Sequence, residues 1–135
     1  MIRSAAPPSL DAFFRALADP TRLRLLNLIA DKEICVCYFV EILRLSQPKI
    51  SRHLAYLRRA GIVGARREGR WMHYRLLNPA DTANSEILKE TLARLRQMPD
   101  MQSDLIKLET RCCNADSSEV LKQAPQPIVL PTSTE

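Results

Sequence analysis

The segment 46-SQPKISRHLAYLRRAG-61 limits the fold more than any other, because it carries signals for both ends of a helix. Ser46 is a good N-cap, and Pro48 suits the first turn, where its missing N–H costs no hydrogen bond. Gly61 suits the left-handed position that commonly follows a helix. The large apolar residues fall on one face and would pack inward: Ile50, Leu54 and Leu57. The sequence therefore predicts a helix over about residues 46–60 with a polar outer face.

Two β-compatible runs follow this helix, Ile62–Arg67 and Trp71–Leu77, and the sequence 67-REGR-70 joins them. Gly69 is a good turn residue, so the pattern predicts a β-hairpin with a basic tip. A short helix from about Cys35 to Leu43 is expected before the longer one. This order of elements is that of a winged helix-turn-helix, with the hairpin as the wing. The expected fold class is therefore mainly α with a small β-hairpin.

The pattern divides the chain into four parts. Residues 1–8 are expected to be a flexible N-terminus, and residues 9–98 the winged helix-turn-helix domain for DNA binding and dimerisation. That domain is expected to contain two further helices at its start, from Ser9 and from Asp19, and a last long helix from Asp81 that Pro99 interrupts. Residues 99–123 are expected to form a helical extension with a cysteine pair. Residues 124–135 contain three prolines and are expected to be a disordered tail.

The composition is that of a soluble protein, with 46% apolar and 26% charged residues. No run of about 18 apolar residues is present, and residues 1–14 lack the apolar core of a signal peptide. We therefore expect a cytoplasmic chain that does not enter a membrane and whose thiols are reduced. The sequence has no Gly-rich phosphate loop, no Ser/His/Asp set and no C-x-x-C motif beside a βαβ pattern. The absence of these motifs argues against an enzyme.

Basic residues are concentrated between Arg44 and Arg75, where nine of them stand against one acid, Glu68. Because the whole chain has a net charge of only +5, the rest of it is net acidic. Such a block indicates a polyanion partner, here double-stranded DNA. The helix over residues 46–60 would be the recognition helix, with candidate DNA contacts Gln47, Lys49, Ser51, Arg52 and His53. The wing would add candidate phosphate contacts Arg66, Arg67 and Arg70.

Three segments together resemble the ArsR/SmtB family of metal-responsive bacterial repressors: 17-LADPTRLRLLNLI-29, 46-SQPKISRHLAYLRRAGIV-63 and 68-EGRWMHYRL-76. The match covers about residues 10 to 97, with the motifs in the right order. The resemblance implies a homodimer that pairs through its first and last long helices. It also implies a palindromic operator that is released when a metal or metalloid binds.

The segment 33-EICVCYFV-40 resembles the Cys-Val-Cys motif that arsenic-sensing members carry before the recognition helix. Members best known for this motif often have a further cysteine three residues later, where this chain has Val40. The resemblance implies As(III) or Sb(III) as the inducer, bound by Cys35 and Cys37, with no organic cofactor. A thiol near a helix N-terminus has a depressed pKa, and soft sulfur ligands select soft ions. The structural alternative is that both cysteines are small buried apolar residues.

The spacing of this pair suggests a mechanism. On a regular helix, residues i and i+2 point about 200° apart, so both thiols can hold one ion only if the first turn is distorted or already unwound. We expect ion binding to melt or tilt this turn and to displace Ser51, Arg52 and His53 from the DNA.

A second pair, Cys112 and Cys113, lies before the tail. One of them could supply a third ligand, as C-terminal cysteines do in some family members. The pair could instead form a separate two-thiol site for a methylated arsenical, or be incidental. A thiol redox sensor and a sensor of another soft metal on the same scaffold also remain open.

Overall fold

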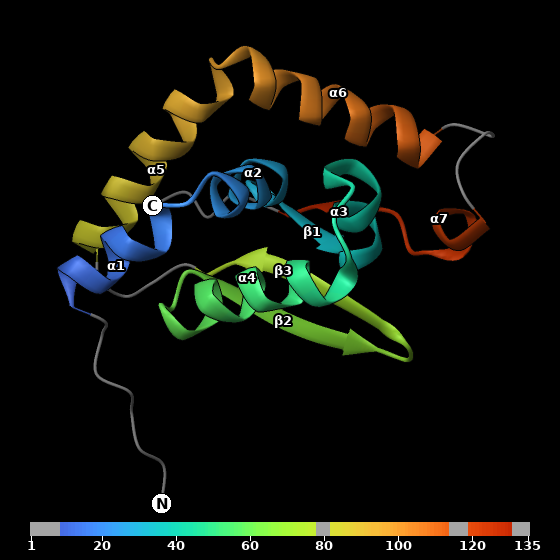
Figure 1. Ribbon diagram of the computed structural model, residues 1–135, viewed down its shortest axis with the longest axis horizontal. Coiled ribbons are helices and arrows are strands. Elements are labelled where there is room, and N and C mark those ends of the chain that lie inside the picture. The colour runs from blue at the N-terminus through green and yellow to red at the C-terminus, as the bar shows by residue number, and fades with distance from the viewer. Residues whose placement is uncertain (1–8, 78–81, 114–118, 131–135) are drawn as a thin grey trace, which may run out of the picture.

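The computed structural model describes residues 9–77, 82–113 and 119–130. The helices are α1 Leu10–Leu17, α2 Pro20–Ile29, α3 Val36–Leu43, α4 Gln47–Arg59, α5 Thr82–Arg96, α6 Pro99–Cys113 and α7 Glu119–Gln123. The strands are β1 Lys32–Cys35, β2 Val63–Glu68, β3 Trp71–Leu76 and β4 Ile128–Val129. Figure 1 shows α5 and α6 as an arch along one side of the molecule. The hairpin β2–β3 and α4 lie on the other side, with α2, α3 and β1 between.

The winged helix-turn-helix is confirmed, and local sequence accounts for its boundaries. The Ser46 side chain caps α4 by accepting a hydrogen bond from the backbone N–H of Lys49. Gly61 follows α4 with φ 74°, and Gly69 turns the hairpin with φ 62°. Arg44, with φ 58°, makes the sharp turn between α3 and α4. These short-range features place α4 at a fixed angle to the helix before it.

One continuous core joins the helices to the sheet. The inner face of α4 contributes Ile50, Leu54 and Leu57, all fully buried. The aromatic rings of Phe39 on α3 and Tyr74 on β3 lie 6.4 Å apart between centroids and link the helix to the sheet. The wing and the helix-turn-helix are therefore packed as one body.

The extension beyond α5 packs on the same core. Arg24 on α2 forms two hydrogen bonds with the buried carboxylate of Asp104 on α6, with N–O distances of 2.7 and 3.0 Å. The Asn27 side chain donates to the backbone carbonyl of Met101, also on α6. Pro99 begins α6 rather than only interrupting the preceding helix, because a first turn tolerates proline.

The sheet is larger than the predicted hairpin. Its four strands have the order β2-β3-β1-β4 with antiparallel pairing throughout. Residues 32–35 form β1, a strand that the sequence did not predict. The predicted helix from about Cys35 to Leu43 is confirmed as α3 Val36–Leu43, with Cys35 at its N-cap. The prediction of disorder from residue 124 fails in part, because Ala124 is buried and residues 128–129 pair with β1. Residues 1–8, 131–135 and the predicted helix start at Asp81 lie outside the described residues.

Among the described residues, no helix is long and apolar enough to cross a bilayer.

Candidate thiol site and nucleic-acid interface

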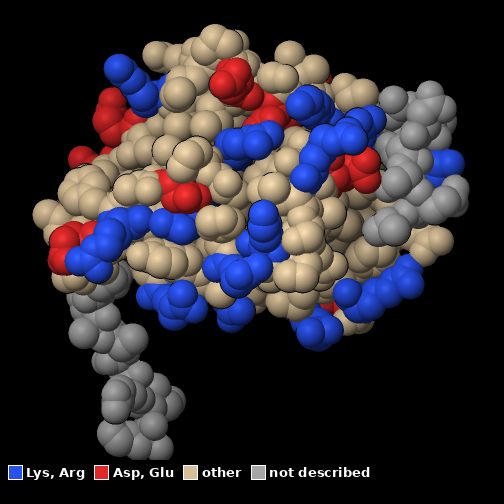
Figure 2. Space-filling model, viewed as in Figure 1, with Lys and Arg blue, Asp and Glu red and all other residues tan. Residues whose placement is uncertain are grey.

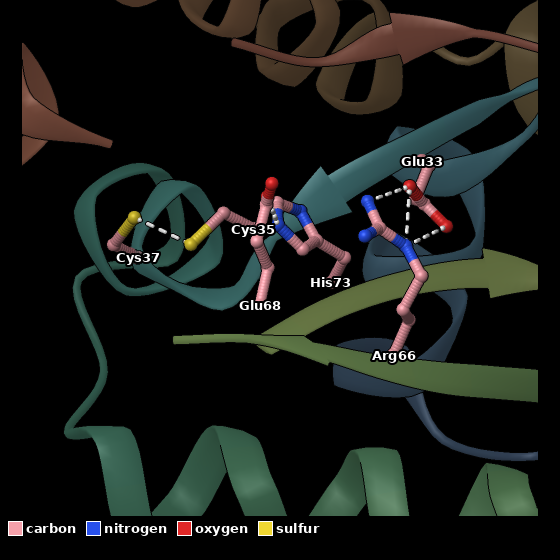
Figure 3. Close-up of polar contacts among 6 residues, drawn as sticks. All are labelled: Glu33, Cys35, Cys37, Arg66, Glu68 and His73. Atoms are coloured by element: carbon pink, nitrogen blue, oxygen red, sulfur yellow. Dashed lines mark hydrogen bonds and ion pairs between the residues drawn. The ribbon is translucent and has the colours of Figure 1, made fainter. Parts of the chain in front are cut away.

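Cys35 and Cys37 lie on either side of a strand-to-helix junction. Cys35 is the last residue of β1 and the N-cap of α3, with extended backbone angles, while Cys37 lies in the first turn of α3. Both are free thiols, Cys35 is fully buried, and the Cys37 thiol donates a hydrogen bond to Cys35 Sγ at 3.0 Å. Figure 3 shows the two sulfur atoms pointing toward each other. Because Cys35 stands outside the helix, the divergence expected on a regular helix does not arise.

The two thiols have opposite acidities. The hydrogen bond from the Cys37 thiol lowers the pKa of Cys35 to about 6 against the effect of burial. The backbone N–H of Cys37 and the charge of His73 act in the same direction. The pKa of Cys37 is raised, because its thiol is the donor in that bond and is also partly buried. At neutral pH the site therefore holds a thiolate at Cys35 and a thiol at Cys37. The thiolate is a nucleophile, and the neighbouring thiol has a proton that a leaving group can take.

A titration of thiolate absorbance in the ultraviolet should detect this asymmetry. In a Cys112→Ser/Cys113→Ser background, one thiolate should form with a midpoint near pH 6, present above it and lost below it. Removing the donor by Cys37→Ala should raise the pKa of Cys35 from about 6, since it removes the largest influence that lowers this pKa and leaves burial, which raises it. Equal midpoints with and without the Cys37 thiol would contradict this account.

The position of a third ligand stays a prediction. Among the side chains that the structure describes, no three of the types His, Cys, Asp and Glu are grouped to hold an ion. Val40, where a third local cysteine would stand, packs against the core. Cys112 and Cys113 form the end of α6, and their side chains lie outside the described residues. The described part of the site is thus a two-thiol site.

The predicted DNA contacts on α4 differ in how free their side chains are. Gln47, Lys49 and Arg52 are exposed, whereas Ser51 and His53 are half-buried. His53 Nδ1 lies 3.3 Å from Arg22 Nη1 and 3.6 Å from the carboxylate of Asp19. The residues of α2 thus hold His53 in place.

Arg22 is a residue of this interface that sequence reasoning missed. Its guanidinium stacks on the Tyr56 ring at 4.1 Å and donates to the backbone carbonyls of Arg15 and Ala16. Its contact with His53 ties α2 to the outer half of α4. Only the helical spacing of Tyr56 and His53 could have indicated a shared neighbour, and nothing in the sequence indicated that it is Arg22.

Each predicted arginine of the wing has a partner within the chain. Arg66 forms an ion pair with Glu33 of β1, with an N–O distance of 2.7 Å. Arg67 donates to the backbone carbonyl of Gly69, and Arg70 donates to Gln123 and stacks on Trp71. Figure 2 shows Lys and Arg side chains along the lower edge of the molecule, where α4 and the hairpin lie in Figure 1. Basic side chains are therefore distributed along this edge from the helix to the wing (Figure 2).

Comparison with known proteins identifies the family. The family model "Bacterial regulatory protein, arsR family" matches residues 19–64. The arsenical resistance operon repressor of Escherichia coli is 38% identical over 108 residues, which cover 79% of this chain and 91% of that protein. The chain belongs to the ArsR family. The arsenic resistance regulator ArsR1 of Pseudomonas putida is 47% identical over 97 residues, which cover 63% of this chain and 76% of that protein.

Solved structures of ArsR-type regulators share the fold. Reduced HlyU from Vibrio cholerae matches with a TM-score of 0.55 and 34% identity, over 65% of this chain and 88% of that one. The antimony-specific transcriptional repressor AntR matches with a TM-score of 0.52 and 28% identity, over 64% and 77%. The chain is thus an ArsR-family transcriptional regulator with a DNA-binding winged helix-turn-helix.

Proposed function

We propose that this ArsR-family protein is an arsenite- or antimonite-responsive repressor that binds operator DNA as a dimer. Release follows when As(III) binds the thiols of Cys35 and Cys37. The observation that carries the proposal is the pair of free thiols, 3.0 Å apart, at the start of the helix that precedes α4. The names of the relatives, which include arsenical and antimony repressors, support the same class of inducer.

The donor set fits a soft trivalent ion. Sulfur ligands select soft metals and metalloids, and the described residues offer no harder oxygen cage around the pair. Two of the three hydroxides of arsenous acid would leave as water as two As–S bonds form. One would take the proton of the Cys37 thiol, and the other would take a proton from solvent, because Cys35 is already a thiolate. The oxidation state of arsenic does not change. Cys112 or Cys113 would supply a third sulfur, or would form a separate site for a methylated arsenical with fewer exchangeable groups.

The proposed dimer uses α1 and α5. On α1, Leu10 and Phe14 are four residues apart on one face of the helix and are exposed by 54% and 47%. A groove of about 680 Å³ between α2 and α5 is lined by apolar and polar side chains, among them Leu23, Ile87 and Leu95. A second copy would cover both features. Two copies would then place two α4 helices on the two halves of a palindrome.

The test is inducer release from a DNA duplex that the wild-type protein selects from a random-sequence library. Arsenite is titrated into the complex, and Kd is followed by fluorescence anisotropy. For the wild type we expect Kd to rise about 5–150-fold, the usual size of an allosteric coupling. The Cys35→Ser/Cys37→Ser variant should bind the duplex normally and show no rise in Kd.

The Cys112→Ser/Cys113→Ser variant is the matched control. A reduced response in it would assign the third ligand to the C-terminal pair, and a full response would leave a two-thiol site at Cys35 and Cys37. If arsenite leaves the wild type bound while peroxide releases it, the thiols act as a redox switch that forms a disulfide. Equal release from all three proteins would show that the pair is not the sensor.

A further inference from the structure

Three residues form one row across three of the four strands of the sheet. Cys35 of β1 is the register partner of His73 of β3, and His73 is the register partner of Arg66 of β2. Register partners in an antiparallel sheet point to the same face. The candidate metalloid ligand therefore stands in line with an arginine of the wing, with one buried histidine between them (Figure 3).

Two carboxylates complete this row from positions two residues away, which share its face. Glu33 precedes Cys35 on β1, and its side chain is only 8% exposed. Arg66 donates to both of its oxygens, with Nη2–Oε1 at 2.7 Å and Nε–Oε2 at 3.3 Å. Glu68 follows Arg66 on β2, and its carboxylate lies 2.8 Å from Nε2 of His73. Each side chain in the row between β1 and the wing thus has a charged or polar partner.

The Glu33–Arg66 pair joins strands that are not neighbours. Because the strand order is β2-β3-β1-β4, Arg66 reaches across β3 to a carboxylate on β1. That carboxylate stands two residues from Cys35, which both ends β1 and caps α3. Cys35 is therefore connected in two directions, through α3 to α4 and through β1 and Glu33 to the wing.

We propose that ion binding at the thiol site also moves the wing, with Glu33 and His73 as positioning residues that couple β1 to Arg66. In the protein without bound ion, the Glu33–Arg66 ion pair holds the wing in the orientation that fits DNA. When both thiols bind one ion, the end of β1 moves. Through Glu33 and His73, this movement displaces Arg66. This inference rests on the proposed metalloid response and names a route for it in addition to α3.

Glu33→Gln tests the coupling, because it removes the charge and keeps the shape of the side chain. Asp104→Asn is the matched control, since it weakens a pair with a similarly buried carboxylate that lies on α6 outside the row. Arsenite binding is measured by calorimetry without DNA, and the Kd for the selected duplex is measured with and without arsenite. Both variants should bind arsenite with the wild-type affinity.

The ratio of the Kd with arsenite to the Kd without arsenite distinguishes a coupling role of Glu33 from a merely structural role. In Glu33→Gln we expect it to fall about tenfold, a loss of about 1.4 kcal/mol of coupling. Arg66, released from its partner, should also add about one phosphate contact and steepen the salt dependence of DNA binding by about 0.9. Asp104→Asn should keep the wild-type ratio and salt dependence. A merely structural role of Glu33 would change both Kd values together and leave their ratio unchanged.

The outcomes are distinguishable. A wild-type ratio in Glu33→Gln, or an equal drop in Asp104→Asn, overturns the wing route while leaving the arsenite response of the wild type intact. Absence of arsenite binding to the wild type overturns both proposals. If Glu33→Gln does not fold, Glu68→Gln decides, because its side chain is 57% exposed and its loss does not threaten the core. That variant should also lower the ratio, and a wild-type ratio in it would overturn the inference.

Discussion

Replacing Ile50 with alanine should lower the free energy of unfolding by about 2–5 kcal/mol. Ile50 lies on the inner face of α4 and is fully buried. The change removes three methyl or methylene groups and leaves a cavity that the rigid neighbours fill only in part. Because α4 is held in place by this inner face, the loss should appear as unfolding of the whole domain. The free energy of unfolding is measured by urea denaturation, with circular dichroism as the signal.

Ile106→Ala is the matched control for this substitution. Ile106 also lies in a helix, α6, but it is 64% exposed. Its replacement should change stability by no more than about 0.5 kcal/mol, as for most surface positions. A similar loss of stability at both positions would show that helix propensity, and not burial of the side chain beneath α4, governs the change in the free energy of unfolding.

Arg52→Ala should weaken binding to the selected duplex by about 1–3 kcal/mol, or about 5–150-fold in Kd. Arg52 is exposed on α4, and its Nε donates a long hydrogen bond of 3.5 Å to the Pro48 carbonyl. The guanidinium is therefore available for a base edge or a phosphate. Stability should change little, because the side chain is exposed.

The salt dependence of Kd tells a base contact from a phosphate contact. Loss of a phosphate contact weakens binding to all duplexes alike and lowers the salt slope by about 0.9, whereas loss of a base contact relaxes sequence preference. Arg96→Ala, which removes an exposed arginine from the end of α5, is the control and should leave Kd unchanged. Equal effects of the two substitutions would contradict the assignment of α4 as the recognition helix.

The recognition helix and the wing could be predicted because their signals are local. Ser46, Pro48 and Gly61 mark the ends of α4 within a few residues of the backbone groups that they satisfy. Gly69 likewise marks the hairpin turn. The apolar spacing of Ile50, Leu54 and Leu57 then fixes which face is buried, so the exposed candidates for DNA contact followed directly.

The thiol site was harder to predict in detail because its geometry depends on distant parts of the chain. Residues 32–35 become a strand by pairing with β3 and β4, which lie about 40 and 95 residues later in the sequence. Their composition alone also fits the start of a helix. The Glu33–Arg66 pair spans 33 residues, and no spacing rule connects its members. The motif therefore predicted the two candidate ligands, but not the junction between strand and helix on which they lie.

The last strand has a consequence for the association state of the protein. Without β4, the outer edge of β1 would present unpaired backbone groups to which another copy could add a strand. The chain fills this edge with its own Ile128 and Val129, and β4 is too short to offer much of an edge itself. Pro127 and Pro131 flank it, and proline has no N–H to extend a ladder. The C-terminal segment thus protects the edge of β1 against strand addition by another copy, and a truncation that removes β4 would expose that edge.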